Sequence, residues 1–401
     1  MRRREQRYCL RLLTRLKLLK YFCAMKNQIV ISTNIQKAIT EAVEGVEHDK
    51  VFLLTDETTE QLCKPLIKDV PCLQETTSIV IGATDTHKTL DTLAQVWTQL
   101  SNEGGSRHSL MVNLGGGMVT DLGGFAASTF KRGIPYINIP TTLLSMVDAS
   151  VGGKTGINFN GLKNEIGVFR TPETVIIDTE FLRTLDHENI CSGYAEMLKH
   201  GLIASPSSSS KLEEGDHSVV EEYVICASCP PPKGKRGIGS LLTFDLDHID
   251  YPLLGQMVGE SVAVKEKIVE EDPLEHGIRK ALNLGHTIGH AFESWALTRK
   301  PCLHGYAVAW GLICELYLSV IKTGFPTETM RQVVRFIKEN YGSLPITCDD
   351  YPELYALMTH DKKNQAGIIN FTLLGDVGDI RINQTATKEE IYETLDFFRE
   401  G

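Results

Sequence analysis

The sequence predicts an α/β domain at residues 25–186, followed by an all-α domain at residues 187–401. Strand-like and helix-like patterns alternate in the first part, and helical patterns dominate the second. The chain has 401 residues, which exceeds the roughly 250–300 residues at which single cores stop growing. Its composition, 42% hydrophobic and 23% charged, is that of a globular protein.

Short apolar runs bounded by polar residues predict the strands of the first domain. They lie at 28–32, 51–54, 78–82, 109–114, 135–139 and 175–178. Helical patterns separate several of these runs, as in residues 88–100, where Leu90, Leu93, Val96 and Trp97 recur at helical spacing. Alternation of strands and helices favours a largely parallel sheet.

Longer helical patterns predict the second domain. They lie at 188–204, 253–271, 280–297, 304–323 and 328–341. Residues 205–242 interrupt the series with Ser-Pro-Ser-Ser-Ser-Ser and a later Pro-Pro-Pro-Lys-Gly-Lys-Arg-Gly. Because this composition buries little apolar surface, we expect a surface loop insertion there.

Charge is distributed unevenly along the chain, whose formal net charge is −10. Residues 1–24 hold eight Lys or Arg and one Glu, so the remainder carries 33 basic and 50 acidic residues, a net charge of −17. An acidic body argues against nucleic-acid binding. We expect the basic extension at 1–24 to lie outside the fold, with Met25 as an alternative start.

The sequence predicts a cytoplasmic protein. No run of about 18 apolar residues is free of charges, so we expect no membrane-spanning helix. The ten cysteines lack the spacing of a disulfide framework, which favours reduced thiols. The single Cys-x-x-Cys pair, Cys226 and Cys229, is a weak zinc signal without a second pair.

Glycines at the end of the 109–114 run are compatible with a Rossmann-like nucleotide site. Gly115, Gly116 and Gly117 follow the strand directly, and a helical pattern follows them. Backbone N–H groups at such a turn can contact a pyrophosphate. The pattern is not Gly-x-Gly-x-x-Gly, because Thr120 occupies the last position, so a plain strand–helix turn fits equally well.

A second glycine-rich stretch, residues 140–164, is unusually polar for a linker. Lys154 follows Gly152 and Gly153 and could contact an anionic oxygen. A P-loop is excluded, because no glycine stands five positions before Gly153. Phosphate or nucleotide contact and a solvated loop both remain open.

Three histidines and a glutamate have the spacing of a metal site. His286 and His290 share one helix face, His304 opens the next helix, and Glu196 lies on an earlier helix. Two His and one Glu fill three positions of a zinc site and leave one open. No Glu follows His286, which argues against a metalloprotease. The alternative is that each histidine is a satisfied core residue.

Polar and basic side chains accompany these histidines. They are Lys199, Lys265, Arg279, Asn283 and the run at 361–364. Each one singly could lie on a solvated face. Together they favour a phosphorylated or carboxylated substrate.

Six motifs together resemble the 3-dehydroquinate synthase family of sugar-phosphate cyclases. They occur in the family's order and cover about residues 26–401 apart from the insertion. The motifs are NLGGGMVTDLGGFAASTFKRG, IPTTLLSMVDASVGGKTGIN, GLKNEIGVF, GYAEMLKHGLI, GIRKALNLGHTIGHAFES and LHGYAVAWGL.

The resemblance implies an NAD-binding domain and a metal-binding domain, usually in a homodimer. It implies conversion of 3-deoxy-D-arabino-heptulosonate 7-phosphate to 3-dehydroquinate and phosphate, a step of the shikimate pathway to aromatic amino acids. The implied reaction combines transient oxidation by NAD, phosphate elimination, re-reduction and an intramolecular aldol closure. The implied ligands are NAD, one divalent metal (zinc or cobalt) and a sugar phosphate, with no nucleic acid or membrane partner.

The resemblance also implies roles for individual residues. The metal ligands would be Glu196, His286 and His304. The catalytic residues would be Glu275, His290, Lys199 and Asp148. The substrate would contact Arg132, Asn164, Lys265, Arg279, Asn283 and Lys362. The NAD site would include Asp56, Asp85, Lys88, Gly116, Gly117, Asp121, Thr141, Thr142, Lys154 and Lys163.

Two positions depart from the family pattern. Tyr306 stands where the family often has Glu, and Asp85 replaces the Glu of a Glu-x-x-Lys pattern ending at Lys88. The alternatives are another NAD- and metal-dependent sugar-phosphate cyclase, a metal-dependent alcohol dehydrogenase, or a non-catalytic relative. Lys265, Arg279 and Asn283 favour a substrate that carries a carboxylate, and the intact ligand set favours an enzyme.

Overall fold

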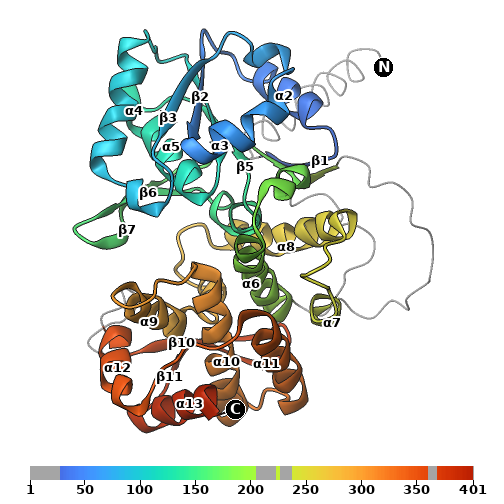
Figure 1. Cartoon of the computed structure of the whole chain (residues 1–401), viewed down its shortest axis with the longest axis vertical. Coiled ribbons are helices and arrows are strands. Elements are labelled where there is room, and N and C mark those ends of the chain that lie inside the picture. Colours follow the sequence, from blue (N-terminus) through green and yellow to red (C-terminus); the bar gives the residue numbers. More distant parts are fainter. Residues whose placement is uncertain (1–27, 205–222, 226–236, 360–367, 401) are drawn as a thin grey trace, which may run out of the picture.

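The chain folds into two lobes, with α6 and α8 lying between them (Figure 1). The computed structural model describes residues 28–204, 223–225, 237–359 and 368–400. One lobe holds a seven-stranded sheet with flanking helices, and the other is mostly helical. The predicted fold class is confirmed in this arrangement. The extension at 1–24, Cys226, Cys229 and Lys362 lie outside the described residues.

The sheet has the strand order β3-β2-β4-β5-β8-β1-β9. Its first six strands pair in parallel, and β9 pairs with β1 antiparallel. All six predicted strands are confirmed: β1 (Gln28–Ser32), β2 (Val51–Asp56), β3 (Thr77–Ile81), β4 (Leu110–Gly115), β5 (Tyr136–Pro140) and β8 (Thr174–Asp178). Every residue of β2, β4, β5 and β8 is buried, as expected where helices cover both faces of a parallel sheet.

Helices follow the strands at the edge where a ligand of such a sheet would bind. They are α2 (Ile35–Glu44), α3 (Glu57–Leu62), α4 (Leu90–Asn102) and α5 (Gly117–Thr129). The helix α5 begins two residues after β4 ends, with Gly116 as its N-cap. The strand–helix turn predicted from Gly115, Gly116 and Gly117 is therefore present.

A hairpin that the sequence analysis did not predict projects from the first lobe (Figure 1). It consists of β6 (Lys154–Phe159) and β7 (Leu162–Phe169), which pair antiparallel. Asn160 and Gly161 form the turn with φ of 55° and 79°, and Asn-Gly is a favoured hairpin turn because both residues tolerate positive φ. Part of the stretch 140–164 is therefore a hairpin rather than an irregular loop, and its contact with phosphate or nucleotide stays a prediction.

The second lobe is built from eight helices among the residues that the structure describes. They are α6 (His187–Ile203), α7 (Ile238–Leu241), α8 (Tyr251–Glu271), α9 (His286–Leu297), α10 (His304–Thr323), α11 (Thr327–Tyr341), α12 (Tyr351–Thr359) and α13 (Lys388–Glu400). A hairpin of β10 (Asn370–Asp376) and β11 (Asp379–Thr385) packs against α10. The region is thus mostly rather than wholly helical.

Two details of this lobe correct the sequence analysis. The helix predicted at 280–297 is a 3₁₀ turn, η7 (Ile278–Asn283), followed by α9, because Gly285 adopts φ 78° between them. The segment 205–242 is not a loop throughout, since β9 (Tyr223–Ile225) extends the sheet and α7 contacts α6. The strand β9 also returns the chain to the first lobe from within the range assigned to the second domain.

The helix α10 is the central element of the second lobe. By length and composition it is apolar enough to cross a membrane, although no such helix was expected from the sequence. Most of it is buried, and it contacts α6, α9, α11, α13 and β10. These contacts make α10 the core helix on which the lobe is assembled.

Candidate metal and nucleotide site

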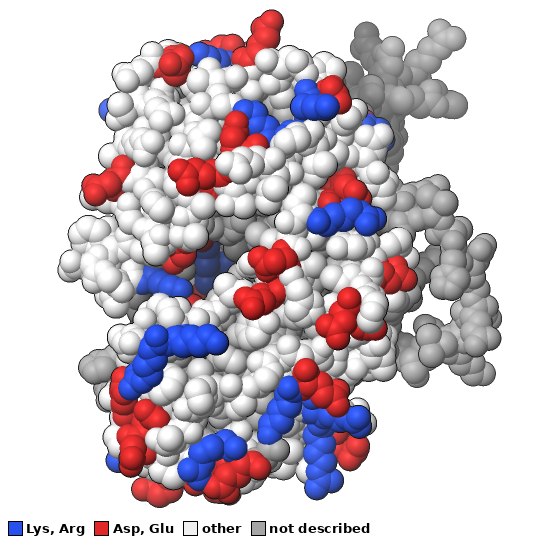
Figure 2. Space-filling model, in the orientation of Figure 1, with Lys and Arg blue, Asp and Glu red and all other residues white. Residues whose placement is uncertain are grey.

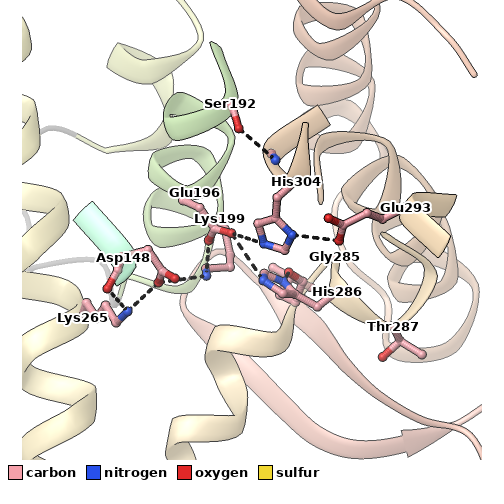
Figure 3. Close-up of polar contacts among 12 residues, drawn as sticks. Asp148, Ser192, Glu196, Lys199, Lys265, Gly285, His286, Thr287, Glu293 and His304 are labelled. Atoms are coloured by element: carbon pink, nitrogen blue, oxygen red, sulfur yellow. Dashed lines mark hydrogen bonds and ion pairs between the residues drawn. The ribbon is translucent and has the colours of Figure 1, made fainter. Parts of the chain in front are cut away.

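Three side chains from three helices meet beside the interface between the lobes (Figure 3). Glu196 comes from α6, and His286 and His304 are the first residues of α9 and α10. The Nε2 atoms of His286 and His304 lie 3.3 and 3.4 Å from the same Glu196 oxygen, Oε1. Glu196 is fully buried. We call these three residues the metal cluster.

The metal cluster fits a divalent cation. A tetrahedral zinc ion with bonds of about 2.0–2.1 Å would hold its ligand atoms roughly 3.3–3.4 Å apart, close to the separations of both Nε2 atoms from Oε1. Glu196 Oε2 forms an ion pair with Lys199, whereas Oε1 is buried without a well-formed hydrogen bond and faces both histidine Nε2 atoms, a position that a cation would satisfy. The donor set of two imidazoles and one carboxylate suits zinc or cobalt.

The neighbours of the two histidines orient their rings. The Nδ1 atom of His286 lies 3.0 Å from the carbonyl oxygen of Leu284, and that of His304 lies 3.1 Å from Glu293 Oε2. An acceptor at Nδ1 favours the tautomer that leaves Nε2 free to bind a metal. His290 lies close enough to His286 and His304 to join a three-histidine group.

Helix packing explains why these ligands converge. Glu315 on α10 accepts hydrogen bonds from the backbone N–H groups of Gly285, Thr287 and Ile288. A buried carboxylate thereby caps α9 at the end that carries His286. At the start of α10, a Cβ on Gly305 would lie 1.8 Å from the carbonyl oxygen of Ser192, so only glycine permits this approach of α10 to α6.

A group of opposite charges adjoins the metal cluster. Asp148 lies in a π-helical turn, η5 (Ser145–Ala149), and its Oδ1 is 2.7 Å from Lys265 Nζ and 3.8 Å from Lys199 Nζ. Lys199 also forms an ion pair with Glu196. Figure 3 shows Lys199 between Asp148 and the metal cluster. The buried lysines place positive charge where an anionic substrate group could bind next to a metal.

The surroundings shift the pKa values of this group. Burial raises the pKa of Asp148 and of Glu196, but the nearby ammonium groups outweigh it and lower both. Burial lowers the pKa of Lys265, and the nearby Asp148 carboxylate only partly offsets this effect. Burial also acts to lower the pKa of Lys199, but Glu196 and Asp148 outweigh it and raise this pKa. Burial also lowers the pKa of His200 to about 3, so this imidazole is neutral near pH 7.

Glu275 is held between the two lobes. Its Oε2 lies 2.5 Å from Lys154 Nζ, and its Oε1 accepts a hydrogen bond of 3.0 Å from the Asn283 amide. The buried guanidinium of Arg279 donates to the carbonyl oxygens of Pro273 and Gly152. The structure thus brings Glu275, Lys154 and Asn283 together, although the resemblance assigned them to different roles.

Several residues assigned to NAD gather on the first lobe. Lys88 Nζ lies 2.6 Å from Asp121 Oδ2 and 2.5 Å from Asn164 Oδ1. Asp85 accepts a hydrogen bond from the Asn158 amide, which ties η3 (Asp85–His87) to the hairpin β6–β7. Burial raises the pKa of Asp121, and Lys88 only partly offsets this effect. We call Lys88, Asp121 and Asn164 the nucleotide-edge triad.

Loops after β4 and β5 complete this edge. A Cβ on Gly116 would lie 3.1 Å from the Thr142 methyl group, and one on Gly117 would lie 3.1 Å from Ala149 Cβ. The backbone N–H of Thr141 donates to the carbonyl oxygen of Gly115. The Asp56 side chain caps α3 by accepting from the Thr59 N–H. The glycines therefore bring the chain close together at the carboxyl ends of parallel strands, where a dinucleotide would bind.

Two assigned substrate residues are not placed at the site. Arg132 is exposed at the end of η4 (Phe130–Arg132), and no contact between it and the metal cluster is found within the described ranges. Lys362 lies in the undescribed range 360–367. Their assignment stays a prediction.

Glu293, which was not singled out from the sequence, contacts both His304 of the metal cluster and Lys163, a residue assigned to NAD. Its Oε2 lies 3.1 Å from His304 Nδ1, and its Oε1 lies 2.6 Å from Lys163 Nζ. Glu293 follows His286 by seven positions on α9, a spacing that places both on one helix face. That spacing was the available signal. Burial raises the pKa of Glu293, but His304 and Lys163 outweigh it and lower this pKa.

A hollow separates the two lobes on the face shown in Figure 2, and Lys or Arg side chains are visible in it. A parallel sheet with a glycine-lined edge, facing a Glu-His-His cluster on helices, defines a class of two-domain proteins suited to a dinucleotide and a divalent metal.

Comparisons with known proteins give the family. The chain matches the models of the 3-dehydroquinate synthase N-terminal domain at residues 78–192 and C-terminal domain at residues 237–364. It is 55% identical to a 3-dehydroquinate synthase of Parabacteroides distasonis, covering 94% of this chain and 99% of that protein. It is 33% identical to that of Clostridium tetani, covering 92% and 91%. The chain belongs to the 3-dehydroquinate synthase family.

Solved structures share the fold at lower identity. A 2-deoxy-scyllo-inosose synthase complexed with carbaglucose-6-phosphate, NAD⁺ and Co²⁺ has a TM-score of 0.73 at 20% identity, covering 94% of this chain and 99% of that one. A 2-epi-5-epi-valiolone synthase of Streptomyces hygroscopicus with NAD⁺ and Zn²⁺ bound has a TM-score of 0.72 at 22% identity, covering 94% and 97%.

Proposed function

We propose that this chain is a 3-dehydroquinate synthase that uses NAD and one divalent metal, zinc or cobalt. It would convert 3-deoxy-D-arabino-heptulosonate 7-phosphate to 3-dehydroquinate and phosphate. The observation that carries the proposal is the 55% identity with a 3-dehydroquinate synthase over 94% of the chain. The buried metal cluster, with Lys199 and Lys265 beside it, supports it chemically.

Glu196, His286 and His304 would hold the metal. A bound divalent metal lowers the pKa of a substrate hydroxyl and stabilises negative charge on its oxygen. The protein contributes by fixing the ligands on three packed helices, with Glu315 and Glu293 orienting α9 and His304. This preorganisation keeps the site intact between turnovers.

Gly116, Gly117, Thr141, Thr142, Lys88 and Asp121 would line the NAD site, together with Asp56, Asp85, Lys154 and Lys163. Bound NAD supplies the hydride acceptor and returns the hydride later, so it is not consumed. The glycines would let the backbone approach a pyrophosphate, and the lysines would balance its charge.

The remaining residues would bind the substrate and move protons. Lys199 and Lys265 would attract its phosphate and carboxylate, and Asp148 would keep these lysines in place. His290 lies beside the metal cluster, with its ring centroid 5.3 Å from that of His286, and would relay a proton. Glu275, held by Lys154 and Asn283, would be the second acid–base group. Arg132, Asn164, Arg279, Asn283 and Lys362 would complete the substrate contacts.

We further propose that two copies of the chain form a homodimer in the cytoplasm, with residues 25–186 and 187–401 as its domains. Exposed apolar side chains on the hairpin β6–β7, among them Phe159, Leu162 and Phe169, support a protein interface. The free cysteines Cys63, Cys72, Cys191, Cys302, Cys314 and Cys348 support a reducing compartment. The acidic body supports the expectation of no nucleic-acid partner.

A product assay tests the proposed activity. Purified protein receives NAD, zinc and the heptulosonate phosphate, and the release of phosphate and of the organic product is followed together. Equimolar phosphate and 3-dehydroquinate, no net NADH and loss of activity with a chelator are expected. An intact, zinc-loaded and NAD-bound protein that releases neither product would contradict the proposal.

A further inference from the structure

We propose that Glu293 is a positioning residue that couples the metal cluster to the hairpin β6–β7 of the nucleotide-binding lobe. The inference rests on the proposed function, because it concerns metal binding by Glu196, His286 and His304. One carboxylate oxygen of Glu293 contacts His304, and the other contacts Lys163. These partners belong to different lobes, because Lys163 lies on β7 and His304 on α10. Figure 3 shows the contact between Glu293 and His304.

The contact with His304 fixes the ring for metal binding. This imidazole lies between two carboxylates, with Nε2 at 3.4 Å from Glu196 Oε1 and Nδ1 at 3.1 Å from Glu293 Oε2. A proton on Nδ1 that is donated to Glu293 leaves the Nε2 lone pair for the metal. His286 uses the carbonyl oxygen of Leu284 for the same purpose. Of the two histidines, His304 is therefore oriented by a carboxylate, whereas His286 is oriented by a backbone carbonyl.

The contact with Lys163 compensates the buried charge. The Glu293 side chain is only 8% exposed, whereas that of Lys163, on β7, is 47% exposed. An ionised carboxylate in this position requires a counter-charge, and Lys163 Nζ supplies one at 2.6 Å. Because Lys163 lies next to the hairpin turn at Asn160 and Gly161, any shift of the hairpin changes the charge balance at Glu293. That change is transmitted to His304 through the shared carboxylate.

The coupling predicts a specific pattern of zinc affinities without NAD. Replacement of a group that orients a metal ligand typically weakens metal binding by about 10–100-fold, and we expect Glu293→Gln to fall in this range. Lys163→Met should weaken zinc binding by about 2–10-fold, because it acts only through Glu293. The double variant should bind zinc no more weakly than Glu293→Gln alone, since the two groups act as one unit.

The experiment measures zinc affinity by competition with a chromogenic chelator in the full-length protein. The matched control is Glu353→Gln, which removes a glutamate that pairs with a cation, Arg299 at 2.9 Å, but contacts no metal ligand. The visible spectrum of the cobalt-loaded protein is the second measurement, because it reports ligand geometry independently of activity. We expect it to change in Glu293→Gln and to stay unchanged in Glu353→Gln.

Thermal denaturation of the metal-free variants checks that they fold. Glu293→Asp separates the effect of losing the charge from the effect of changing the side chain. It retains the charge on a shorter side chain, and we expect its zinc affinity to lie between wild type and Glu293→Gln. Wild-type zinc affinity and an unchanged cobalt spectrum in folded Glu293→Gln would overturn the proposal. Additive losses in the double variant would overturn the coupling. A wild-type protein that binds no zinc would instead overturn the proposed function.

Discussion

The metal cluster and the nucleotide-edge triad are held in place by different forces. Glu196 is fully buried, and the helices that carry the cluster are fixed by a buried cap at Glu315 and by close packing at Gly305. The nucleotide-edge triad depends on side-chain ion pairs and on an exposed hairpin, because Asn164 lies on β7, all of whose residues are exposed. The second lobe therefore holds its cluster by buried helix packing, whereas the first lobe holds part of its site by side-chain contacts to an exposed strand.

The largest expected effect follows from removing a ligand of the preformed site. His286→Ala should abolish tight zinc binding and reduce phosphate release by about 1000-fold or more, equivalent to roughly 4 kcal/mol. Zinc content and phosphate release in the same preparation measure the two effects. The control is His248→Ala, which alters an exposed histidine paired with Asp245. Full zinc content in His286→Ala would show that the cluster does not bind the metal.

The second largest effect is expected at Asp148, whose carboxylate pairs with Lys265 beside the metal cluster. Asp148→Asn leaves Lys265 buried without its carboxylate partner at 2.7 Å. Breaking a buried pair costs about 3–5 kcal/mol of unfolding free energy. The Asp148 side chain is 27% exposed, so we expect a smaller loss, about 2–3 kcal/mol. Urea denaturation at pH 7 measures it, with the exposed Asp245→Asn as the control.

The same variant gives a pH test with a defined sign. The lysines lower the pKa of Asp148, so its stabilisation is fully present above the ordinary Asp pKa of about 3.9 and is lost as the pH falls below it. The stability difference between wild type and Asp148→Asn should therefore shrink on acidification. A difference that grows below pH 4 would mean that the ionised carboxylate does not stabilise the fold.

The two regions also differ in how well the sequence predicts them. Periodicity identified the parallel strands and most helices because each buries a regular apolar face. The spacing of His286 and His290 indicated a metal site on one helix face, but the set of Glu196, His286 and His304 came from the family resemblance. The hairpin β6–β7 was missed because β7 is exposed along its whole length and β6 is buried only in its middle, so neither strand shows a regular apolar alternation, although Asn160-Gly161 signalled a turn. The pairing of Lys163 with Glu293 joins residues 130 positions apart, and no local pattern encodes it.

A moderate effect is expected at the nucleotide-edge triad. Lys88→Met removes the ammonium group that contacts Asp121 and Asn164, which leaves the partly buried Asp121 without this cation. We expect NAD affinity to fall by about 10-fold, equivalent to roughly 1.4 kcal/mol, and zinc affinity to fall less than in Lys163→Met, because Lys163 keeps its contact with Glu293. Fluorescence titration with NADH measures it, and Lys64→Met, which breaks the pair with Glu60, is the control. A larger loss of zinc affinity in Lys88→Met than in Lys163→Met would show that Lys88 acts on the metal cluster by a route other than Lys163 and Glu293.

The smallest effect on stability is expected beside the turn of the hairpin β6–β7, where a substitution tests whether this surface is a dimer interface. Leu162 is 53% exposed on β7, so Leu162→Ser should change the unfolding free energy of a single chain by no more than about 0.5 kcal/mol. If this apolar surface packs against a second copy, the same substitution should weaken self-association by about 10-fold or more, because interface leucines are buried on binding. Sedimentation over a range of protein concentrations measures association, and Leu90→Ser, at an exposed leucine on α4, is the control. Unchanged association of Leu162→Ser in a dimeric protein would place the dimer interface elsewhere, and the hairpin would then serve the nucleotide site alone.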